Sequence, residues 1–579
     1  MGIAMISKSS EKLIETIRNS IVGDDVVIDG PYGARRVTYA DYTASGRALK
    51  FIERFISDEV MPMYANTHTE TSGTGLQTTR FREEARAIIH SAVGGKDDDI
   101  VIFCGSGATG AINKIVDILN ITLPANLDSR YELSAQIPAE ERPVVFIGPY
   151  EHHSNELPWR ESIADVITID ENSDGQIDLE QLERELIKYQ NRPLKIGSFS
   201  AASNVTGIGS KTQLTSKLLH RYGAYSFWDF AAAGPYVDIE MNMKDDSEYG
   251  NLAYKDAIFI STHKFIGGPG TPGILVAKRH LFTNLVPSQP GGGTVSYVNA
   301  EEHRYHDDPI HREEGGTPDI VGAIRAGLVF QLKEAVGYQA IREKEHSFIQ
   351  RAIQSWSGND NISILGNPNA WRLSIVSFMI KHKEHYLHHN FVVALLNDLF
   401  GIQARGGCSC AGPYGHRLLG IDLTTSQAFE KEVLKGCEGI KPGWARVNFN
   451  YFISEDVFAF LLEAVHLIAD QGWKLLPFYE FHPMTGQWKH KEMKTQNCMS
   501  LHQLRYRNGH LSYPAKRMTA PEWVLPDYIQ EVKELFDALS LEGTSEASDP
   551  SLSESFQKLR WFSLPLEAQK ELNLLPKTS

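Results

Sequence analysis

The sequence predicts an α/β fold, in which helices cover a mostly parallel β-sheet, followed by a smaller α+β domain. Between residues 95 and 280, short apolar runs end in polar or glycine-rich turns, and each turn leads into a helix-like segment. Apolar runs that alternate with helices are typical of a parallel sheet buried on both faces. From about residue 325 to 475, helical segments alternate with strand-like ones such as RLSIVSFMI, which indicates the second unit.

The composition fits an enzyme and argues against several other classes of protein. A chain of 579 residues with 42% hydrophobic residues can bury a large core. The net charge of −15 argues against broad nucleic-acid binding, which needs a basic face. The sequence has neither the run of about 20 apolar residues of a membrane span nor the apolar stretch of a signal peptide. Five cysteines are too few for a disulfide framework, so a reducing, cytoplasmic setting is expected.

We expect four parts along the chain. Residues 1–40 form a segment associated with the small domain, residues 41–322 the large domain that binds the ligand, and residues 323–480 the small domain. Residues 481–579 are an extension that matches no domain we recognise. This extension is basic at first and of low complexity around 540–556, where a flexible linker is expected.

Five apolar runs of the large domain are directly followed by polar side chains. We predict that DIVIFC, PVVFI, LKIGSF, AYSFWD and AIFIS are strands. Ligands of parallel sheets bind at the carboxyl ends of the strands, so the residues after these runs should share one site. They are Ser106 to Thr109, His152 and His153, Asn204, Asp229, and His263 with Lys264.

Each of these residues also has a purely structural interpretation. The turn in CGSGATG could be a simple connection, whereas as a functional cradle Gly105, Gly107, Ala108 and Thr109 would expose N–H groups that favour phosphate. A histidine after a strand is usually a loop or core residue, and an aspartate there is often a cap. Lys264 differs, because lysine rarely enters an apolar interior unless it is paired or covalently occupied, and burial would lower the pKa of its amine.

Together, these groups match what pyridoxal 5′-phosphate requires. Lysine forms a Schiff base, a carboxylate pairs with the pyridinium nitrogen, a flat imidazole covers the ring, and a backbone cradle holds the phosphate. We know of no other common cofactor that asks for this combination, so the sequence predicts a pyridoxal phosphate enzyme.

From about residue 38 to 470, the chain resembles the class V aminotransferases among fold-type I pyridoxal phosphate enzymes. Within them it is most similar to group II cysteine desulfurases and selenocysteine lyases. The resemblance rests on STHK, EHHSNELPW, SNVTG, WDFAAAGP and SGATGAIN, and on GGGTV and EEGGTPD. It implies a large domain with a mostly parallel seven-stranded sheet, and a homodimer with shared active sites.

The resemblance implies a role for each residue at the cofactor. Lys264 would be the Schiff-base lysine, His152 would stack on the ring, and Asp229 would pair with the pyridinium nitrogen. The remaining cofactor contacts, on the phosphate and on the ring hydroxyl, would come from Ala108, Thr109, Asn204, Ser261 and His263. Thr294 and Thr317 would contribute to the neighbouring subunit's site.

A second set of residues is implied on the substrate side. The segments DYTASGRAL and YANTHTETSGTG resemble loops that border the substrate, and WARVNFNYF resembles the segment whose arginine clamps the substrate carboxylate. The residues implied are Ala44, Ser45, His68, Asn204, Arg405 and Arg446.

The stretch ARGGCSCAGPYGH contains two of the five cysteines. Arg405, Gly407, Cys410 and Ala411 fit the family pattern Arg-x-Gly-x-x-Cys-Ala, which implies that Cys410 accepts sulfur and becomes a persulfide. Some activation of its thiol by neighbouring cations is expected, with Arg405 and His416 as candidates.

The chain departs from the family pattern at two positions. Cys408 stands where relatives usually have His, and the cysteine pair is similar in spacing to that of molybdenum cofactor sulfurases, although residues 481–579 are short for the long C-terminal domain of those proteins. Cys408 can therefore be a persulfide relay, a bystander, or a metal ligand together with Cys410. Ala232 replaces a Gln that in many relatives contacts the cofactor. The sequence therefore identifies the cofactor more firmly than the reaction.

The stretch DENSDGQIDLEQ, residues 170–181, imitates a calcium-binding EF-hand loop. Its twelfth position is Gln181, where calcium needs a bidentate glutamate, and ADVITID before it is typical of a strand. We therefore expect a strand, a turn and the start of a helix here, and no metal site.

Three functions remain open at this point. A cysteine desulfurase would convert L-cysteine, or a related amino acid, to alanine and pass the sulfur from Cys410 to an acceptor protein. Alternatively, the same scaffold would catalyse transamination, epimerisation or carbon–sulfur lysis, and Cys410 would not be the nucleophile. A scaffold without catalysis is disfavoured by the complete lysine, aspartate and histidine set. The Arg-x-Gly-x-x-Cys spacing favours the desulfurase.

Overall fold

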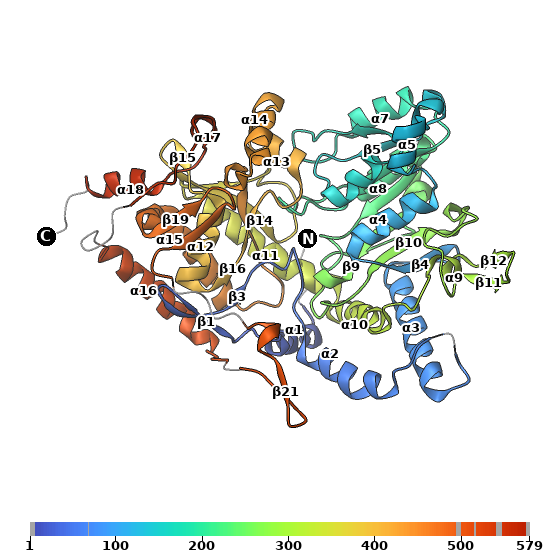
Figure 1. Ribbon diagram of the computed structural model, residues 1–579, viewed down its shortest axis with the longest axis horizontal. Coiled ribbons are helices and arrows are strands. Elements are labelled where there is room, and N and C mark those ends of the chain that lie inside the picture. Colours follow the sequence, from blue (N-terminus) through green and yellow to red (C-terminus); the bar gives the residue numbers. More distant parts are fainter. Residues whose placement is uncertain (1–5, 68, 494–498, 515–516, 540–546, 575–579) are drawn as a thin grey trace.

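The computed structural model describes residues 6–67, 69–493, 499–514, 517–539 and 547–574. Two units lie side by side in Figure 1, the large domain on the right and the small domain on the left. Helix α1 (Lys8–Ser20) lies near their junction, and its Ile14 and Ile17 are buried in the core of the large domain.

The large domain is built on a seven-stranded sheet in the order β4-β10-β9-β8-β7-β5-β6. Its strands are β4 (Asp99–Cys104), β5 (Val144–Ile147), β6 (Asp165–Thr168), β7 (Lys195–Ser200), β8 (Tyr225–Asp229), β9 (Ala257–Ser261) and β10 (Gly273–Lys278). Neighbouring strands are parallel except where β10 pairs with β4 and β9. The predicted α/β class and the mostly parallel seven-stranded sheet are therefore confirmed.

Alternating side chains of each strand enter two separate cores. In β4, Val101 and Phe103 join the larger core, whereas Ile100 and Ile102 join the core on the other face. Both faces of the strand are apolar because helices cover both sides of the sheet. The covering helices are α3 (Gly73–Ala92), α4 (Gly107–Ile118), α6 (Leu157–Arg160), α7 (Leu179–Lys188), α8 (Thr212–Arg221) and α10 (Ile320–Val336).

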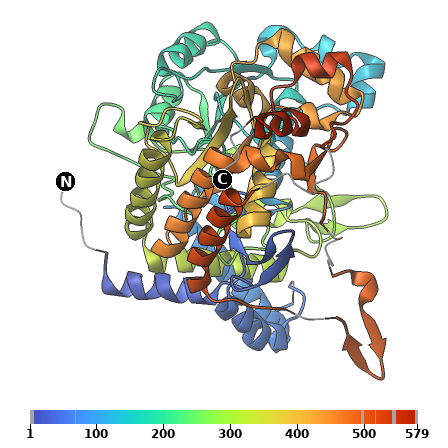
Figure 2. The same cartoon turned by 90° about the vertical axis from the view of Figure 1, so that its left-hand side faces the viewer.

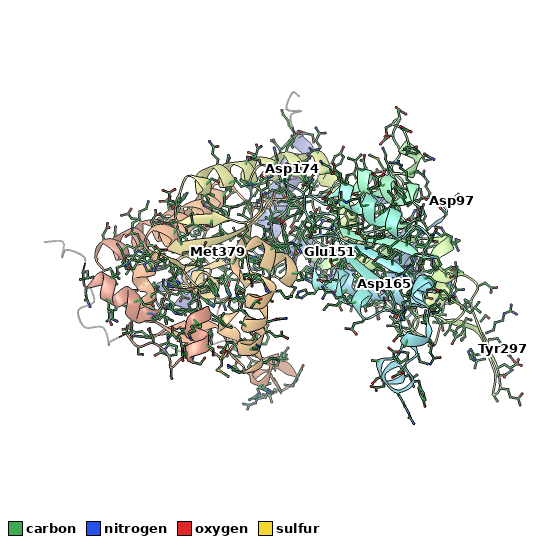
Figure 3. All side chains as sticks on the ribbon, turned by 90° about the horizontal axis from the view of Figure 1, so that it is seen from above. Asp97, Glu151, Asp165, Asp174, Tyr297 and Met379 are labelled. Atoms are coloured by element: carbon green, nitrogen blue, oxygen red, sulfur yellow. The ribbon has the colours of Figure 1, made fainter. Side chains whose placement is uncertain are left out.

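Shorter elements complete the large domain. They are α2 (Lys50–Phe55), α5 (Ala125–Tyr131), α9 (Pro309–Glu313), and the hairpin of β11 (Val295–Val298) with β12 (His303–Tyr305). Tyr297 in this hairpin lies at an outer tip of the molecule (Figure 3).

The EF-hand-like stretch is a strand, a turn and a helix start, as expected. It follows β6, bridges Glu171 to Ile177, and leads into α7. The Asp178 carboxylate accepts hydrogen bonds from the N–H groups of Glu180 (2.9 Å) and Gln181 (3.0 Å), so it is the N-cap of α7.

The small domain is an antiparallel sheet covered by helices. Its order is β13-β14-β18-β17, with β15 also paired to β14. The strands are β13 (Ile362–Ile364), β14 (Ile375–His382), β15 (His385–Tyr386), β17 (Arg405–Gly407) and β18 (Trp444–Asn448). The helices are α11 (Tyr338–Ser357), α12 (His389–Phe400), α13 (Gly412–Leu418), α14 (Leu423–Leu434) and α15 (Glu455–Gln471). Met379 of β14 marks this sheet in Figure 3.

The strands of the N-terminal segment lie against the small domain. β1 (Val27–Gly30) and β2 (Gly33–Arg36) form a hairpin, and β3 (Thr38–Tyr39) pairs in parallel with β16 (Ile402–Gln403). This pairing brings the residues directly after β3 to the junction between the two domains.

The C-terminal extension wraps around the small domain, and Figure 2 faces it. It consists of β19 (Tyr479–His482), β20 (Gln487–His490), β21 (Arg505–Arg507), β22 (His510–Ser512), α16 (Leu525–Asp537), α17 (Glu554–Leu559) and α18 (Pro565–Leu572). Trp488, Phe536 and Phe562 are buried in the core of the small domain with Phe391 of α12. Among the described residues, no helix combines the length and the apolar character that crossing a membrane requires.

If the extension is part of the small-domain core, Phe562→Ala should lower the free energy of unfolding by about 3–5 kcal/mol. Phe562 is 0% exposed and contacts the His388 ring at 4.6 Å between centroids. Thermal unfolding measures the effect, with Leu501→Ala, at an 84% exposed position of the same extension, as the control. Equal and small shifts in both variants would contradict this role.

Candidate active site

A cavity of about 240 Å³ opens at the carboxyl ends of the parallel strands, where the small domain meets the sheet. Loops after β4, β5, β7, β8 and β9 line it, together with residues from β17, β18 and the cysteine loop. The structure brings most of the predicted site residues together here. They are Ala44, Ala108, Thr109, His152, Asn204, Asp229, Ser261, His263, Lys264, Arg405, Cys410 and Arg446.

The other predicted residues lie outside the lining of this cavity. Thr294 is buried before β11, where its hydroxyl donates to the Gly291 carbonyl (2.7 Å). Thr317 accepts a hydrogen bond from Asn66 Nδ2 (3.3 Å). His416 lies on α13. His68 lies outside the described residues.

Lys264 and Asp229 are charged groups placed directly after neighbouring strands. Asp229 ends β8, and Lys264 closes a single 3-10 turn after β9. Burial lowers the pKa of Lys264 to about 8, and the nearby Asp229 charge opposes this shift. Burial raises the pKa of Asp229, while the Ala231 N–H (2.7 Å) and Lys264 favour its ionised form. A lysine with this pKa has a substantial free-amine fraction near neutral pH, so it is a competent nucleophile.

His152 presents a neutral imidazole to the cavity. Its Nδ1 accepts a hydrogen bond from the Ser154 N–H (3.1 Å), so the neutral ring carries its proton on Nε2. Burial lowers the pKa of His152 to about 4, and the positive charge of Lys264 adds to the effect. The Ser154 hydroxyl also bonds to the hydroxyl of Thr109 (2.6 Å).

The turn between β4 and α4 forms a cradle for an anion. The Ser261 hydroxyl accepts a hydrogen bond from the Ala108 N–H (2.8 Å), which ties the start of α4 to the end of β9. Gly107 has φ +56°, and a Cβ there would lie 2.7 Å from His263 Cε1, so a side chain is excluded. The free N–H groups of the α4 N-terminus, with the Thr109 hydroxyl, are donors suited to a phosphate.

One carboxylate holds both arginines of the cavity. Asp41 Oδ1 accepts from Arg446 Nη2 (3.0 Å), and Asp41 Oδ2 accepts from Arg405 Nε (3.0 Å). Arg446 Nη1 also donates to the Asn204 carbonyl (2.9 Å). Arg446 is buried, whereas the Arg405 side chain is 51% exposed and its terminal nitrogens have no hydrogen-bond partner among the described residues. The pair can therefore receive a further carboxylate, as two guanidinium groups commonly do.

The cysteine loop is bound to the large domain by its backbone. Ser409 and Cys410 have φ of +54° and +55°, a conformation that is unfavourable for residues other than glycine. Asn204 Nδ2 donates to the Ser409 carbonyl (2.8 Å), and the His153 N–H donates to the Cys410 carbonyl (2.9 Å). Cys410 is exposed, whereas Cys408 is half-buried. Cys410 and Arg446 both line the cavity.

Sequence reasoning missed Asp41, Glu151 and Ser154. Glu151, which Figure 3 places at the centre of the molecule, accepts from the Ser200 N–H (2.9 Å), the Ser200 hydroxyl (2.6 Å) and Asn155 Nδ2 (2.6 Å). Burial raises its pKa to about 7. Asp41 and Glu151 both lie inside motifs that the sequence analysis identified. Their charge, next to predicted site residues, was the signal by which they could have been found.

The sequence profile described as Aminotransferase class-V matches residues 38–425. Because this match covers more than half of the chain, the protein belongs to the class V aminotransferase family of enzymes. That family depends on pyridoxal 5′-phosphate.

Relatives and solved structures agree with this assignment. The chain is 25% identical over 415 residues to a probable cysteine desulfurase of Staphylococcus aureus, covering 71% of this chain and 92% of the relative. A probable cysteine desulfurase of Staphylococcus epidermidis is also 25% identical, with 71% and 91% covered. The apo cysteine desulfurase of Thermococcus onnurineus NA1 has the same fold, with TM-score 0.60, 22% identity, and 75% and 95% covered. An Escherichia coli cysteine desulfurase gives TM-score 0.56 at 20% identity, with 74% and 93% covered.

Asp41→Asn should lower the free energy of unfolding by about 3 kcal/mol, because it leaves the buried Arg446 guanidinium without its anion. Chemical denaturation measures the change. The matched control is Asp308→Asn, because Asp308 forms exposed ion pairs with Arg279 and His311, whose loss should cost less than about 1 kcal/mol. A loss no larger than the control's would mean that Arg446 does not depend on Asp41.

The pKa of Lys264 predicts a distinct pH profile of amine labelling. Labelling by a small acylating reagent, read by mass spectrometry, should rise about tenfold per pH unit below 8 and level off above it, whereas exposed lysines rise towards about pH 10.4. Asp229→Asn should move the plateau to lower pH, because the aspartate charge favours the protonated amine. A Lys264 profile that still rises at pH 10 would contradict the lowered pKa.

Proposed function

We propose that this protein is a pyridoxal phosphate-dependent cysteine desulfurase that converts L-cysteine to L-alanine and retains the sulfur on Cys410 as a persulfide. The observation that carries the proposal is the exposed Cys410 thiol in the same cavity as Lys264 and Arg446. The names of the curated relatives, probable cysteine desulfurases, support it. The fit of Arg405 to Cys410 to the Arg-x-Gly-x-x-Cys pattern favours the group II branch.

The residues of the cavity fit pyridoxal phosphate. Asn204 Oδ1 is buried without a hydrogen-bond partner among the described residues, and the lack of a Cβ at Gly107 lets the turn approach Ser261 and His263 closely. We assign the phosphate to Ala108, Thr109, Ser261 and His263. When bound, the cofactor supplies an electron sink that stabilises negative charge at the substrate Cα.

The other cofactor and substrate contacts follow from the charges of the cavity. Asp229 provides the carboxylate for the ring nitrogen, His152 offers a flat neutral ring, and Lys264 Nζ binds the cofactor and later moves a proton. Arg405 and Arg446 orient the substrate carboxylate, as their shared Asp41 anchor allows. Ala44 borders the substrate.

Cys410 would accept the sulfur of the substrate in one balanced step. The carbon–sulfur bond of L-cysteine breaks, a sulfur–sulfur bond forms to Cys410 Sγ, and the substrate Cβ gains a proton to give alanine. Cys410 lines the same cavity as Arg446, and the thiolate is the nucleophilic form of cysteine. The outer sulfur atom of the persulfide is then passed to an acceptor protein in the cytoplasm.

We also propose that the enzyme is a homodimer. Thr294 and Thr317 lie outside the cavity of their own chain and are assigned to the neighbouring subunit's site, as the family resemblance implies. Neither nucleic acid nor a membrane is needed for this reaction.

Cys410→Ala should abolish both products of the cofactor-loaded enzyme, with a fall of at least about a hundredfold, because the sulfur has no acceptor. Sulfide is measured in the presence of a reductant, and alanine by mass spectrometry. Cys408→Ala is the matched control, since it removes the half-buried thiol of the same loop.

Lys264→Ala should lose both the visible absorbance of bound cofactor and the products. Alanine formed equally without Cys410 would contradict its role as the nucleophile. Bound cofactor without alanine formation would instead favour another reaction of the same scaffold, such as transamination, epimerisation or carbon–sulfur lysis.

A further inference from the structure

Residues 499–514, called the arm below, project from the body of the protein as a hairpin (Figure 2). β21 pairs with β22, and Tyr506 lies directly opposite Leu511. Asn508 and Gly509 at the turn have φ of +54° and +77°, as tight Asn-Gly hairpin turns require. The two strands of the arm are therefore joined by a turn of a type that favours hairpins.

The two faces of the arm differ in chemistry. Because side chains alternate along each strand, Tyr506, Leu511 and their neighbours Leu504 and Tyr513 share one face. The other face presents a cationic set, Arg505, Arg507 and His510. The apolar face is uncovered: Tyr506 is 83% exposed and Tyr513 is 50% exposed.

The described part of the chain leaves this apolar face uncovered, as the exposure of Tyr506 indicates. Within the described residues, the hydrogen bonds of the arm all close inside the arm itself. The chain that follows the arm is attached to the N-terminal segment, because the Val27 N–H donates to the Met518 carbonyl (3.0 Å) and the Ala520 N–H donates to the Asp25 carbonyl (2.9 Å). A two-stranded hairpin is only marginally stable in water, and an uncovered apolar face of this kind indicates an interaction site.

The charge of the chain favours a second copy as the partner. The arm contains two arginines and no acidic residue, whereas the whole chain has a net charge of −15. The basic arm and the acidic body of a second copy are therefore complementary in charge.

The body also presents an apolar patch along the edge from which the arm projects. Met61 is 50% exposed, Met63 41% and Tyr64 43%. They continue the chain from α2, which lies with β21 at the lower edge of Figure 1.

We propose that the arm packs its apolar face against Met61, Met63 and Tyr64 of the partner subunit, and that the same contact is returned about a two-fold axis. Such reciprocal contacts are the usual form of a dimer interface. The arm lies outside residues 38–425, so this contact is an addition to the family fold. This contact rests on the homodimer that we propose above, but it does not depend on sulfur chemistry at Cys410.

The contact would also stabilise the segment of residues 63–66, which leads to the active site. The Thr78 hydroxyl donates to the Met63 carbonyl (3.2 Å) and accepts from the Ala65 N–H (3.0 Å), and Asn66 donates to Thr317. The patch thus leads directly into the loop that the sequence assigned to the substrate side.

Photo-crosslinking tests the partner directly. A benzophenone amino acid replaces Tyr506 in the full-length holoenzyme, and equal amounts of ¹⁴N-labelled and ¹⁵N-labelled chains are mixed and illuminated. We expect crosslinked peptides of mixed isotope content that join the arm to residues 61–64. Absence of mixed-isotope crosslinks, or crosslinks confined to one chain, would overturn the proposal.

Dissociation of the dimer on dilution provides the second measurement. Tyr506→Ser with Leu511→Ser should raise the dimer dissociation constant at least about tenfold. The matched control is Tyr131→Ser with Leu127→Ser on α5, an exposed tyrosine–leucine pair outside the arm (52% and 47%), which should leave the dissociation constant unchanged. Equal behaviour of the two double variants would overturn the proposal, even if desulfurase activity is present. Conversely, absence of that activity with mixed-isotope crosslinks would contradict only the proposed function.

Discussion

The arrangement of the cavity depends on the Asp41 carboxylate, which joins three distant parts of the chain. Asp41 follows β3, whereas Arg405 and Arg446 lie on β17 and β18 of the small domain. A buried guanidinium is costly without an anion, so Arg446 can face the cavity only because Asp41 compensates its charge. The Arg446 bond to the Asn204 carbonyl extends the same connection to the large domain, where Asn204 in turn holds the cysteine loop.

Burial then gives the titratable groups of the cavity their properties. The same desolvation lowers the pKa of Lys264 to about 8 and that of both His152 and His263 to about 4. The histidines are therefore neutral at physiological pH, and the lysine is partly so. A neutral imidazole beside the turn that we assign to the phosphate can donate one hydrogen bond without adding charge, while the two arginines remain the cationic groups of the cavity.

The sequence predicted the elements whose signals are local. Apolar runs ending in Asp229 and Lys264 marked strands of the parallel sheet, and the CGSGATG turn marked the start of α4. Contacts between distant residues could not be predicted in this way, because Asp41 and Arg405 are 364 positions apart. The sequence left the role of the extension open, because the partners of Trp488 and Phe562 in the core of the small domain, such as Phe391, lie far away along the chain. The left-handed backbone at Cys410 is accompanied by hydrogen bonds from Asn204 and His153, which are likewise distant in the sequence.

The central claim is that Cys410, fixed beside Arg446 at the rim of this cavity, is the sulfur acceptor. The most direct measurement is peptide mass mapping of the cofactor-loaded enzyme after a single exposure to L-cysteine without reductant. The account predicts one additional sulfur atom on Cys410 and one equivalent of alanine. Sulfur found on Cys408 alone, or alanine formed with no sulfur on either cysteine, would contradict it.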